Sequence, residues 1–344
     1  MSHQLAKSRQ WRHPDRSMIF VILSIAAFFS MIVALAFKNM GPRWMVIAGI
    51  ATAATAANDT PLLQQREDLT SFQVIAHRGA SGHAPESTLA AYELAHRWGV
   101  DYLELDAQLS ADGEVVLFHD DTLERTSDGE GHIHDYTLAE LKTMDTGTWF
   151  TEAHPARREE EHRGAQILTL AELFDHFGHT PRYYIETKSP DLNPGLEEAL
   201  VERLEAYDMI EQGRVLVQSF DQESLLKVRT ANPHVPLIQL LWYSPSEQDS
   251  ATLTEWNDTT PGADSIRDED FERIAEYAVG IGTNAAYRGQ EVIDADFVRQ
   301  AQAHGLSVHV YTINEQDEMK RLMALGVDGL FTDYPDRLLE LVSE

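Results

Sequence analysis

The 344-residue sequence contains no cysteine, which excludes disulfide bonds, thiolate metal sites and a cysteine nucleophile. Positive charge is scarce as well, because 27 Lys and Arg stand against 56 Asp and Glu and leave a formal net charge of −29. A chain this acidic repels a nucleic-acid backbone, so no nucleic-acid partner is expected. The HExxH, GxSxG and Walker motifs are also missing, which disfavours a zinc protease, a serine hydrolase and a nucleotidase.

The charge is unevenly distributed along the chain. Residues 1–60 carry six basic and two acidic side chains, a balance of +4, so the remaining 284 residues carry −33. Within this basic part, residues 18–37 are twenty consecutive uncharged positions, of which only two serines are polar. At about 1.5 Å per residue, a helix of this length would cross a hydrocarbon layer of roughly 30 Å. The sequence therefore predicts a transmembrane or signal-anchor segment at residues 18–37, after a basic cytoplasmic tail at residues 1–17.

Four basic residues precede this segment and two follow it closely, which by the positive-inside rule leaves the N-terminus in the cytoplasm. Residues 38–71 then form a linker that contains a second apolar stretch at residues 44–57. The small residues at its end resemble a signal-peptide cleavage site, and the stretch would alternatively form the second arm of a helical hairpin. We expect a membrane-anchored protein with an extracytoplasmic domain, on the periplasmic or outer face. A second span would return the domain to the cytoplasm.

Residues 72–344 alternate short β-like runs with helical patterns, which is typical of parallel β/α architecture. Nine runs have the composition of strands, at residues 74–77, 102–109, 115–119, 183–187, 215–220, 237–242, 279–283, 307–313 and 329–332. Helical patterns lie between most of them, for example at residues 87–98, 196–207, 271–277, 294–304 and 315–324.

One connection is too short for a parallel crossover. Only residues 110–114 join the second and third runs, and Asp112-Gly113 suits the turn of an antiparallel hairpin. Setting the hairpin aside leaves eight strands, the number that closes a TIM-type barrel. A doubly wound open sheet is disfavoured because no glycine-rich phosphate loop follows the first strand. We therefore predict an α/β fold, a (β/α)8 barrel with a β-hairpin excursion after strand 2.

Barrel enzymes place their chemistry at the C-terminal ends of the strands. The first strand ends at His77 and Arg78, and the second contains Glu104 and Asp106. These two carboxylates are two positions apart and therefore lie on one face of the strand. In an antiparallel sheet the alternation would be a solvated face. A barrel strand is buried on both faces, so two inward carboxylates are costly unless a cation lies between them.

Two further strand ends add charged residues. The hairpin closes with His119, and the next strand ends with Glu186 and Lys188 on one face. Three carboxylates without cysteine suit a hard divalent cation, Mg²⁺ or Ca²⁺. An arginine and a lysine facing such an ion would bind an anionic phosphate group, and two histidines would serve as general acid and base.

Five stretches of the sequence follow one another in an order that one enzyme family shares. They are the run that opens HRGASGHAPEST and ends RTSDGEG at residues 77–131, IETK at 185–188, VQSF at 217–220, VYTIN at 310–314 and GVDGLFTDYPD at 326–336. Together they resemble the glycerophosphodiester phosphodiesterase family over residues 72–340, which makes residues 72–344 the expected catalytic barrel.

The resemblance implies a role for every predicted site residue. One divalent cation would be bound by Glu104, Asp106 and Glu186. The general acid and base would be His77 and His119. The phosphate group would be bound by Arg78 and Lys188. In one departure, the family usually has Pro-Glu-Asn-Thr where this chain has Ser87 in place of the asparagine. We expect Ser87 to cap the following helix.

These roles imply metal-dependent hydrolysis of a glycerophosphodiester to sn-glycerol 3-phosphate and an alcohol such as choline or ethanolamine. The nearest alternative is lysophospholipase D-like hydrolysis of a lipid that keeps its acyl chain, which an apolar groove at the barrel mouth would favour. A non-catalytic membrane-tethered binder of phosphate esters would require the loss of a site residue, and none is lost. The sequence identifies no protein partner.

Two other features carry less weight. The run His132-Ile133-His134-Asp135 imitates a metal-binding HxH motif, but it follows the hairpin instead of the first strand, and we interpret it as a solvated loop. Residues 244–270 are rich in acidic side chains and would form either a roof over the substrate mouth or a surface insertion.

Overall fold

The computed structural model describes residues 69, 71–157, 162–245, 253–255, 268–287 and 289–343. The predicted membrane segment at residues 18–37 and the apolar stretch at residues 44–57 lie outside these ranges. Among the residues that are described, no helix combines the length and the apolar character needed to cross a membrane.

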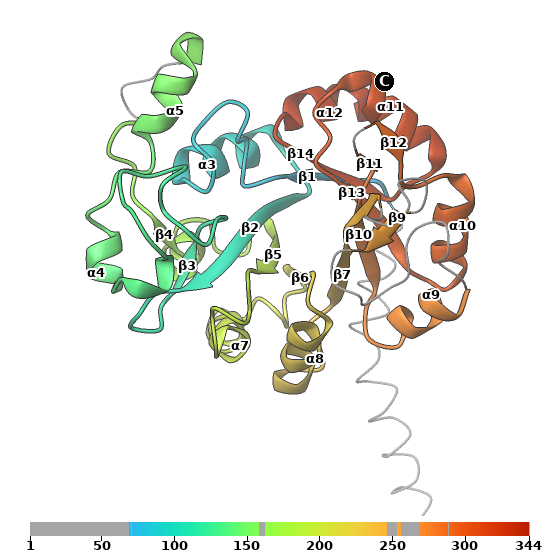
Figure 1. Cartoon of the computed structure of the whole chain (residues 1–344), viewed down its shortest axis with the longest axis horizontal. Helices are drawn as coiled ribbons and strands as arrows, with labels where there is room; N and C mark the ends of the chain where they lie inside the picture. Colours follow the sequence, from blue (N-terminus) through green and yellow to red (C-terminus); the bar gives the residue numbers. More distant parts are fainter. Residues whose placement is uncertain are drawn as a thin grey trace, which may run out of the picture. The chain divides into compact units, whose positions relative to one another are not determined.

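Eight parallel strands form a closed barrel, which confirms the predicted TIM-type fold (Figure 1). Neighbours in the barrel follow the chain order, and closure comes from β1, which pairs with β2 on one side and β14 on the other. The strands are β1 (Gln73–Ala76), β2 (Tyr102–Leu109), β5 (Arg182–Thr187), β6 (Val215–Ser219), β7 (Leu237–Leu241), β10 (Gly280–Asn284), β13 (Ser307–Tyr311) and β14 (Gly329–Thr332).

The predicted hairpin is present, but it opens a larger excursion than the sequence indicated. Strand β3 (Val115–Leu117) pairs antiparallel with β2, and β4 (Leu168–Thr169) pairs antiparallel with β3. Between β3 and β4, the described residues form two short helices, α4 (Leu138–Leu141) and α5 (Thr148–Ala153), and two 3-10 turns. The excursion has its own small core, made of Val116, Phe118, Leu123, Ile133, Leu141 and Ile167.

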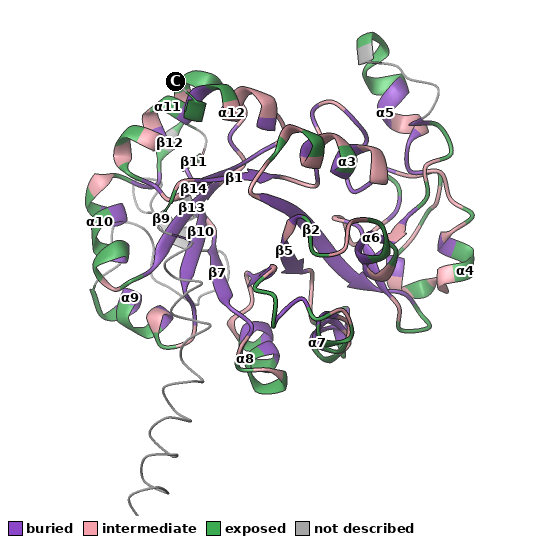
Figure 2. Cartoon of the chain, turned by 180° about the vertical axis from the view of Figure 1, so that it is seen from behind, coloured by how far each residue is buried: buried purple, intermediate pink, exposed green. Residues whose placement is uncertain are grey.

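Amphipathic helices cover the outside of the barrel and bury one face each against it (Figure 2). Several begin at a side-chain cap; Asp221, for example, accepts hydrogen bonds from Glu223 N and Ser224 N at the start of α8. The helices are α3 (Leu89–Trp98), α6 (Leu170–Phe177), α7 (Leu196–Ala206), α8 (Gln222–Ala231), α9 (Asp268–Ala275), α10 (Ala295–Ala303), α11 (Gln316–Leu325) and α12 (Pro335–Ser343).

Two hydrophobic cores separate the inside of the barrel from its outer face. The larger one joins the strands to the surrounding helices. The smaller one fills the barrel interior with Leu69, Ile75, Tyr102, Tyr184, Leu216, Ile238, Val279 and Phe331. Since this inner core packs against the first residues of several strands, the space that remains open lies toward the C-terminal ends of the strands.

Two small antiparallel pairs of strands follow β7 and β10 of the barrel. Strand β8 (Tyr243–Pro245) pairs with β9 (Leu253–Glu255), and β11 (Ala286–Tyr287) pairs with β12 (Gln290–Glu291). Most of residues 244–270 lie outside the described part of the chain, so their expected position over the mouth stays a prediction.

Candidate active site

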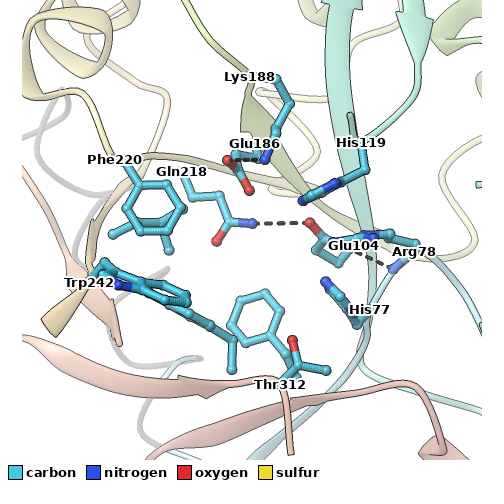
Figure 3. A pocket seen from close by; sticks show the side chains of 13 residues that line it. His77, Arg78, Glu104, His119, Glu186, Lys188, Gln218, Phe220, Trp242 and Thr312 are labelled. Atoms are coloured by element: carbon cyan, nitrogen blue, oxygen red, sulfur yellow. Dashed lines mark hydrogen bonds and ion pairs between the residues drawn. The ribbon is translucent and has the colours of Figure 1, made fainter. Parts of the chain in front are cut away.

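A pocket of about 580 Å³ opens at the C-terminal ends of the barrel strands (Figure 3). Six of the seven predicted site residues line it, and the seventh, Asp106, is buried beside them. The lining residues are His77, Arg78, Glu104, His119, Glu186, Lys188, Gln218, Phe220, Leu240, Trp242, Tyr311, Thr312 and Phe331.

The three predicted metal ligands form one cluster. Glu104 and Asp106 share a face of β2, and the register of the parallel pair places Asp106 opposite Glu186 of β5. One carboxylate oxygen from each residue lies within 4.8 Å of the others, and all three side chains are buried. The part of the chain that is described contains no other group of three such ligands, so His132 and His134 do not form a second site with a third residue.

The electrostatics of this cluster fit a bound cation. Burial and the charge of Asp106 raise the pKa of Glu104 well above its usual value. Burial alone would also raise the pKa of Asp106, but His119, Arg78 and Lys188 lower it to about 2. Both oxygens of Asp106 are nevertheless buried without a hydrogen bond from any described residue. Buried carboxylate oxygens that accept no hydrogen bond are the donors that a hard divalent cation uses.

Both predicted phosphate-binding cations reach the edge of the carboxylate cluster. Arg78 Nε lies 3.3 Å from Asp106 Oδ2, and Lys188 Nζ lies 3.0 Å from Glu186 Oε1 and 3.8 Å from Asp106 Oδ1. Burial lowers the pKa of Lys188, but Glu186 and Asp106 outweigh it and raise the pKa overall. Both side chains therefore stay protonated at neutral pH inside the pocket.

The backbone after β1 is shaped to present Arg78. Arg78 has a φ of 56°, and its N–H donates to Glu104 Oε2 at 2.8 Å. The next residue, Gly79, has a φ of 83°, and a Cβ there would lie 2.7 Å from the Ala91 carbonyl carbon. Only glycine fits this turn, and the left-handed conformation of Arg78 is the kind of strain that concentrates at functional sites.

His77 is oriented by a residue that the sequence did not indicate. Its Nδ1 donates to Asp333 Oδ1 at 2.7 Å, and Asp333 also accepts from Ser81 Oγ and Asn314 Nδ2. Burial raises the pKa of Asp333, but its hydrogen bond with His77 contributes to an overall value of about 2. Because the carboxylate can only accept, Nδ1 carries the proton and Nε2 is left for chemistry. Burial and the charge of Arg78 lower the pKa of His77 itself.

His119 is held in the same way by its neighbour in the chain. Its Nδ1 lies 2.6 Å from Asp120 Oδ1, which leaves its other ring nitrogen for the pocket. In Figure 3 the two histidines and Arg78 lie along one edge of the pocket, opposite Phe220 and Trp242. A third contact missed by the sequence is Gln218, whose Nε2 lies 3.3 Å from Glu104 Oε1.

The opposite wall of the pocket is apolar. Phe220 and Trp242 follow the ends of β6 and β7, and Tyr311 ends β13. The Trp242 and Tyr311 rings are nearly parallel, with centroids 6.4 Å apart. Leu240 and Phe331 lie deeper and complete the surface. The pocket therefore has one charged wall and one apolar wall.

The expected cap at Ser87 is wrong. Thr88 caps α3, where its Oγ1 accepts from Ala91 N at 3.4 Å. Ser87 instead has a φ of 57°, in the left-handed region that asparagine adopts more readily than serine. The family's asparagine fits this backbone better.

Comparisons with known proteins agree with the geometry of the pocket. The Glycerophosphoryl diester phosphodiesterase family matches residues 77–337. A glycerophosphodiester phosphodiesterase of Bacillus subtilis is 38% identical over 295 residues, which cover 85% of this chain and 92% of that protein. A second one, from Caldanaerobacter subterraneus subsp. tengcongensis, is 34% identical over 78% of this chain and 97% of its own length.

A solved structure is similar over nearly its whole length. It is a phosphodiesterase of Oleispira antarctica in complex with the product sn-glycerol-3-phosphate. Its sequence is 29% identical, the TM-score is 0.64, and the match covers 79% of this chain and 97% of that one.

Proposed function

Because this chain belongs to the glycerophosphodiester phosphodiesterase family and is an enzyme of that class, we propose that it hydrolyses its substrate with one divalent cation and two histidines. The products would be sn-glycerol 3-phosphate and an alcohol such as choline or ethanolamine. The observation that carries this proposal is the buried cluster of Glu104, Asp106 and Glu186 in the same pocket as His77 and His119.

The charged wall matches what a phosphodiester requires. Its anionic oxygens repel a nucleophile, and the transition state is still more negative. Glu104, Asp106 and Glu186 would hold Ca²⁺ or Mg²⁺, which supplies positive charge against the phosphoryl oxygens. Arg78 and Lys188 lie beside the carboxylates and would bind the remaining phosphate oxygens, because both remain protonated there.

The two histidines would move the protons. One imidazole removes a proton from the attacking hydroxyl, which belongs either to water or to the glycerol, in which case a cyclic phosphate forms first. The other imidazole protonates the leaving alkoxide, which is otherwise a poor leaving group. Asp333 and Asp120 would hold the proton on Nδ1 of His77 and His119, so that Nε2 of each ring faces the substrate.

Product analysis with glycerophosphocholine tests this proposal. The wild-type enzyme with Ca²⁺ or Mg²⁺ is expected to release sn-glycerol 3-phosphate and choline. His77→Ala and His119→Ala are expected to lose turnover by about a hundredfold or more while they keep the wild-type melting temperature. Turnover by either variant at the wild-type rate would refute its histidine's role.

A second substrate class is favoured by the apolar wall. Phe220, Trp242 and Tyr311 form an apolar surface that an acyl chain would contact, and a pocket of about 580 Å³ falls in the size range of sites for drug-sized ligands. A lysophospholipid that keeps its acyl chain would use this wall. Turnover of lysophosphatidylcholine comparable to that of glycerophosphocholine would support this alternative, and its absence would exclude it. A non-catalytic binder is disfavoured because all seven site residues gather at one pocket.

We propose that residues 18–37 anchor the enzyme to a membrane, with the barrel outside the cytoplasm. The support is the uncharged stretch itself and the basic residues before it. External protease applied to intact cells is expected to digest the barrel. Protection of the barrel would favour a second span at residues 44–57 and a cytoplasmic domain.

A further inference from the structure

One arginine outside the pocket contacts two carboxylates with its whole guanidinium group. Arg125 lies in the excursion after β3 and does not line the pocket. Its Nη1 and Nη2 donate to the two oxygens of Glu86 at 2.8 and 2.7 Å. Its Nε and Nη2 donate to the two oxygens of Asp120 at 2.6 and 2.8 Å. Arg125 therefore joins the loop after β1 to the segment that follows β3.

Each of these carboxylates also holds a residue of the charged wall. Glu86 Oε1 accepts from Arg78 Nη1 at 2.8 Å, and Asp120 Oδ1 lies 2.6 Å from His119 Nδ1. The same two oxygens are the ones that Arg125 Nη2 contacts. The result is a continuous chain of alternating charge that consists of Arg78, Glu86, Arg125, Asp120 and His119.

We propose that Arg125 is a positioning residue that sets Arg78 and His119 relative to each other. The inference rests on the proposed function, in which Arg78 binds the phosphate and His119 transfers a proton. Without Arg125, Glu86 would be held by Arg78 alone, and Asp120 by His119 alone. The two ends of the chain would then adjust independently, although both must meet one phosphate group.

Arginine is specific for this role. Its planar group donates from three nitrogens in a fixed fork and can bind two carboxylates at once, whereas a lysine ammonium acts as a point charge. Of the two carboxylates, Glu86 is the more buried, because its side chain is 12% exposed and that of Asp120 is 27% exposed. The Arg125 side chain is 44% exposed. A bidentate pair with a mostly buried carboxylate also contributes to stability, so a large loss of turnover reflects geometry where the melting temperature is unchanged.

The first test compares Arg125→Ala and Arg125→Lys with the control Arg203→Ala. The control removes another partly exposed ion pair, which joins Arg203 to Glu114 in the turn between β2 and β3. Both Arg125 variants are expected to lose about ten- to a hundredfold in kcat, with a higher KM and an unchanged melting temperature. Arg203→Ala is expected to keep wild-type kinetics. Added guanidinium is expected to restore part of the activity of Arg125→Ala. It is expected to restore no activity to Arg125→Lys, in which the lysine side chain occupies the space of the missing group.

The second test is a double-mutant cycle. Glu86→Gln and Asp120→Asn are each expected to lower kcat/KM. The double variant is expected to lose less than the product of the two single fold losses, because either substitution alone already interrupts the chain of contacts through Arg125. In the Arg125→Ala background the two effects are expected to multiply.

Three results separate the inference from the proposed function. A wild-type enzyme that turns over no glycerophosphodiester or lysophospholipid would refute the proposed function. An active wild type with wild-type kcat in Arg125→Lys would overturn the positioning role. So would multiplicative effects of Glu86→Gln and Asp120→Asn in the wild-type background. If Arg125→Ala fails to fold, the lysine variant and the cycle in the wild-type background decide.

Discussion

The two walls of the pocket come from different parts of the barrel and are held in different ways. The charged wall comes from β1, β2, β5 and the hairpin, and its side chains are fixed by hydrogen bonds and ion pairs, as Arg78 and His77 are. The apolar wall comes from β6, β7, β13 and β14, and its side chains meet through ring contacts such as that of Trp242 with Tyr311. In the proposed function, the groups that react lie on the charged wall, and the groups that only bind the substrate lie on the apolar wall. Each wall can therefore be altered by mutation without changing the other.

The largest expected effect comes from the charged wall. Asp106→Asn keeps the shape of the side chain but removes one of three negative charges from the proposed cation site. We expect kcat/KM to fall by about a thousandfold or more, equivalent to about 4 kcal/mol. Glu114→Gln, in the same hairpin but away from the pocket, is the control. Activity near wild type in Asp106→Asn would remove this carboxylate from the cation site.

A smaller loss is expected one step behind the wall. Asp333→Asn removes the carboxylate that keeps the proton on His77 Nδ1. We expect kcat to fall about ten- to a hundredfold, with little change in KM. Asp336→Asn is the matched control, because Asp336 pairs with His83 at 2.9 Å outside the pocket. Equal kinetics of the two variants would contradict the role of Asp333.

Below the apolar wall, β13 also contributes a buried histidine to the barrel interior. Burial lowers the pKa of His309 to about 3, and its Nδ1 lies 2.9 Å from Tyr184 Oη. The unfolded chain binds a proton there near pH 6.5, whereas the folded chain does not, so stability falls as the pH drops below 6.5. This group alone should cost about 2 kcal/mol of unfolding free energy between pH 7 and pH 5.

His309→Gln isolates that contribution, because glutamine can accept from Tyr184 but does not titrate. Denaturant unfolding at both pH values is expected to show a smaller drop in the variant than in the wild type, by the amount given above. The same drop in both proteins would show that His309 has the same pKa in the folded chain as in the unfolded chain.

The smallest effect is expected from the apolar wall. Trp242→Ala should lower kcat/KM for lysophosphatidylcholine about tenfold more than for glycerophosphocholine if the wall contacts an acyl chain. Leu226→Ala, an exposed leucine on α8, controls for loss of apolar surface elsewhere. Equal losses on both substrates would mean that the wall contacts a part that both substrates share.

The strands, and the gathering of the seven candidate residues at one end of the barrel, could be predicted because both depend on local patterns. Strands β2 and β14 have the predicted bounds, and Glu104 and Asp106 share a face because side chains alternate along a strand. The positioning residues depend on contacts between distant segments. Asp333 lies 256 positions from His77, and only the pairing of Ala76 with Thr332 at barrel closure brings them together.

Other misses have similar physical reasons. Asp120 follows His119 directly, but neighbours along an extended chain point in opposite directions, so adjacency gave no sign of their contact. Arg125 and Glu86 belong to loops 39 positions apart. The small core of the excursion was missed because its helices are too short to produce a periodic pattern.

The central claim is that the charged wall works through a divalent cation held by Glu104, Asp106 and Glu186. Its most direct test is the rate of glycerophosphocholine hydrolysis after dialysis against EDTA, followed by titration with Ca²⁺ or Mg²⁺. We predict that chelation abolishes turnover. One equivalent of the correct ion is expected to restore the turnover of the wild-type enzyme but not that of the Asp106→Asn variant. Full turnover in EDTA would contradict the claim.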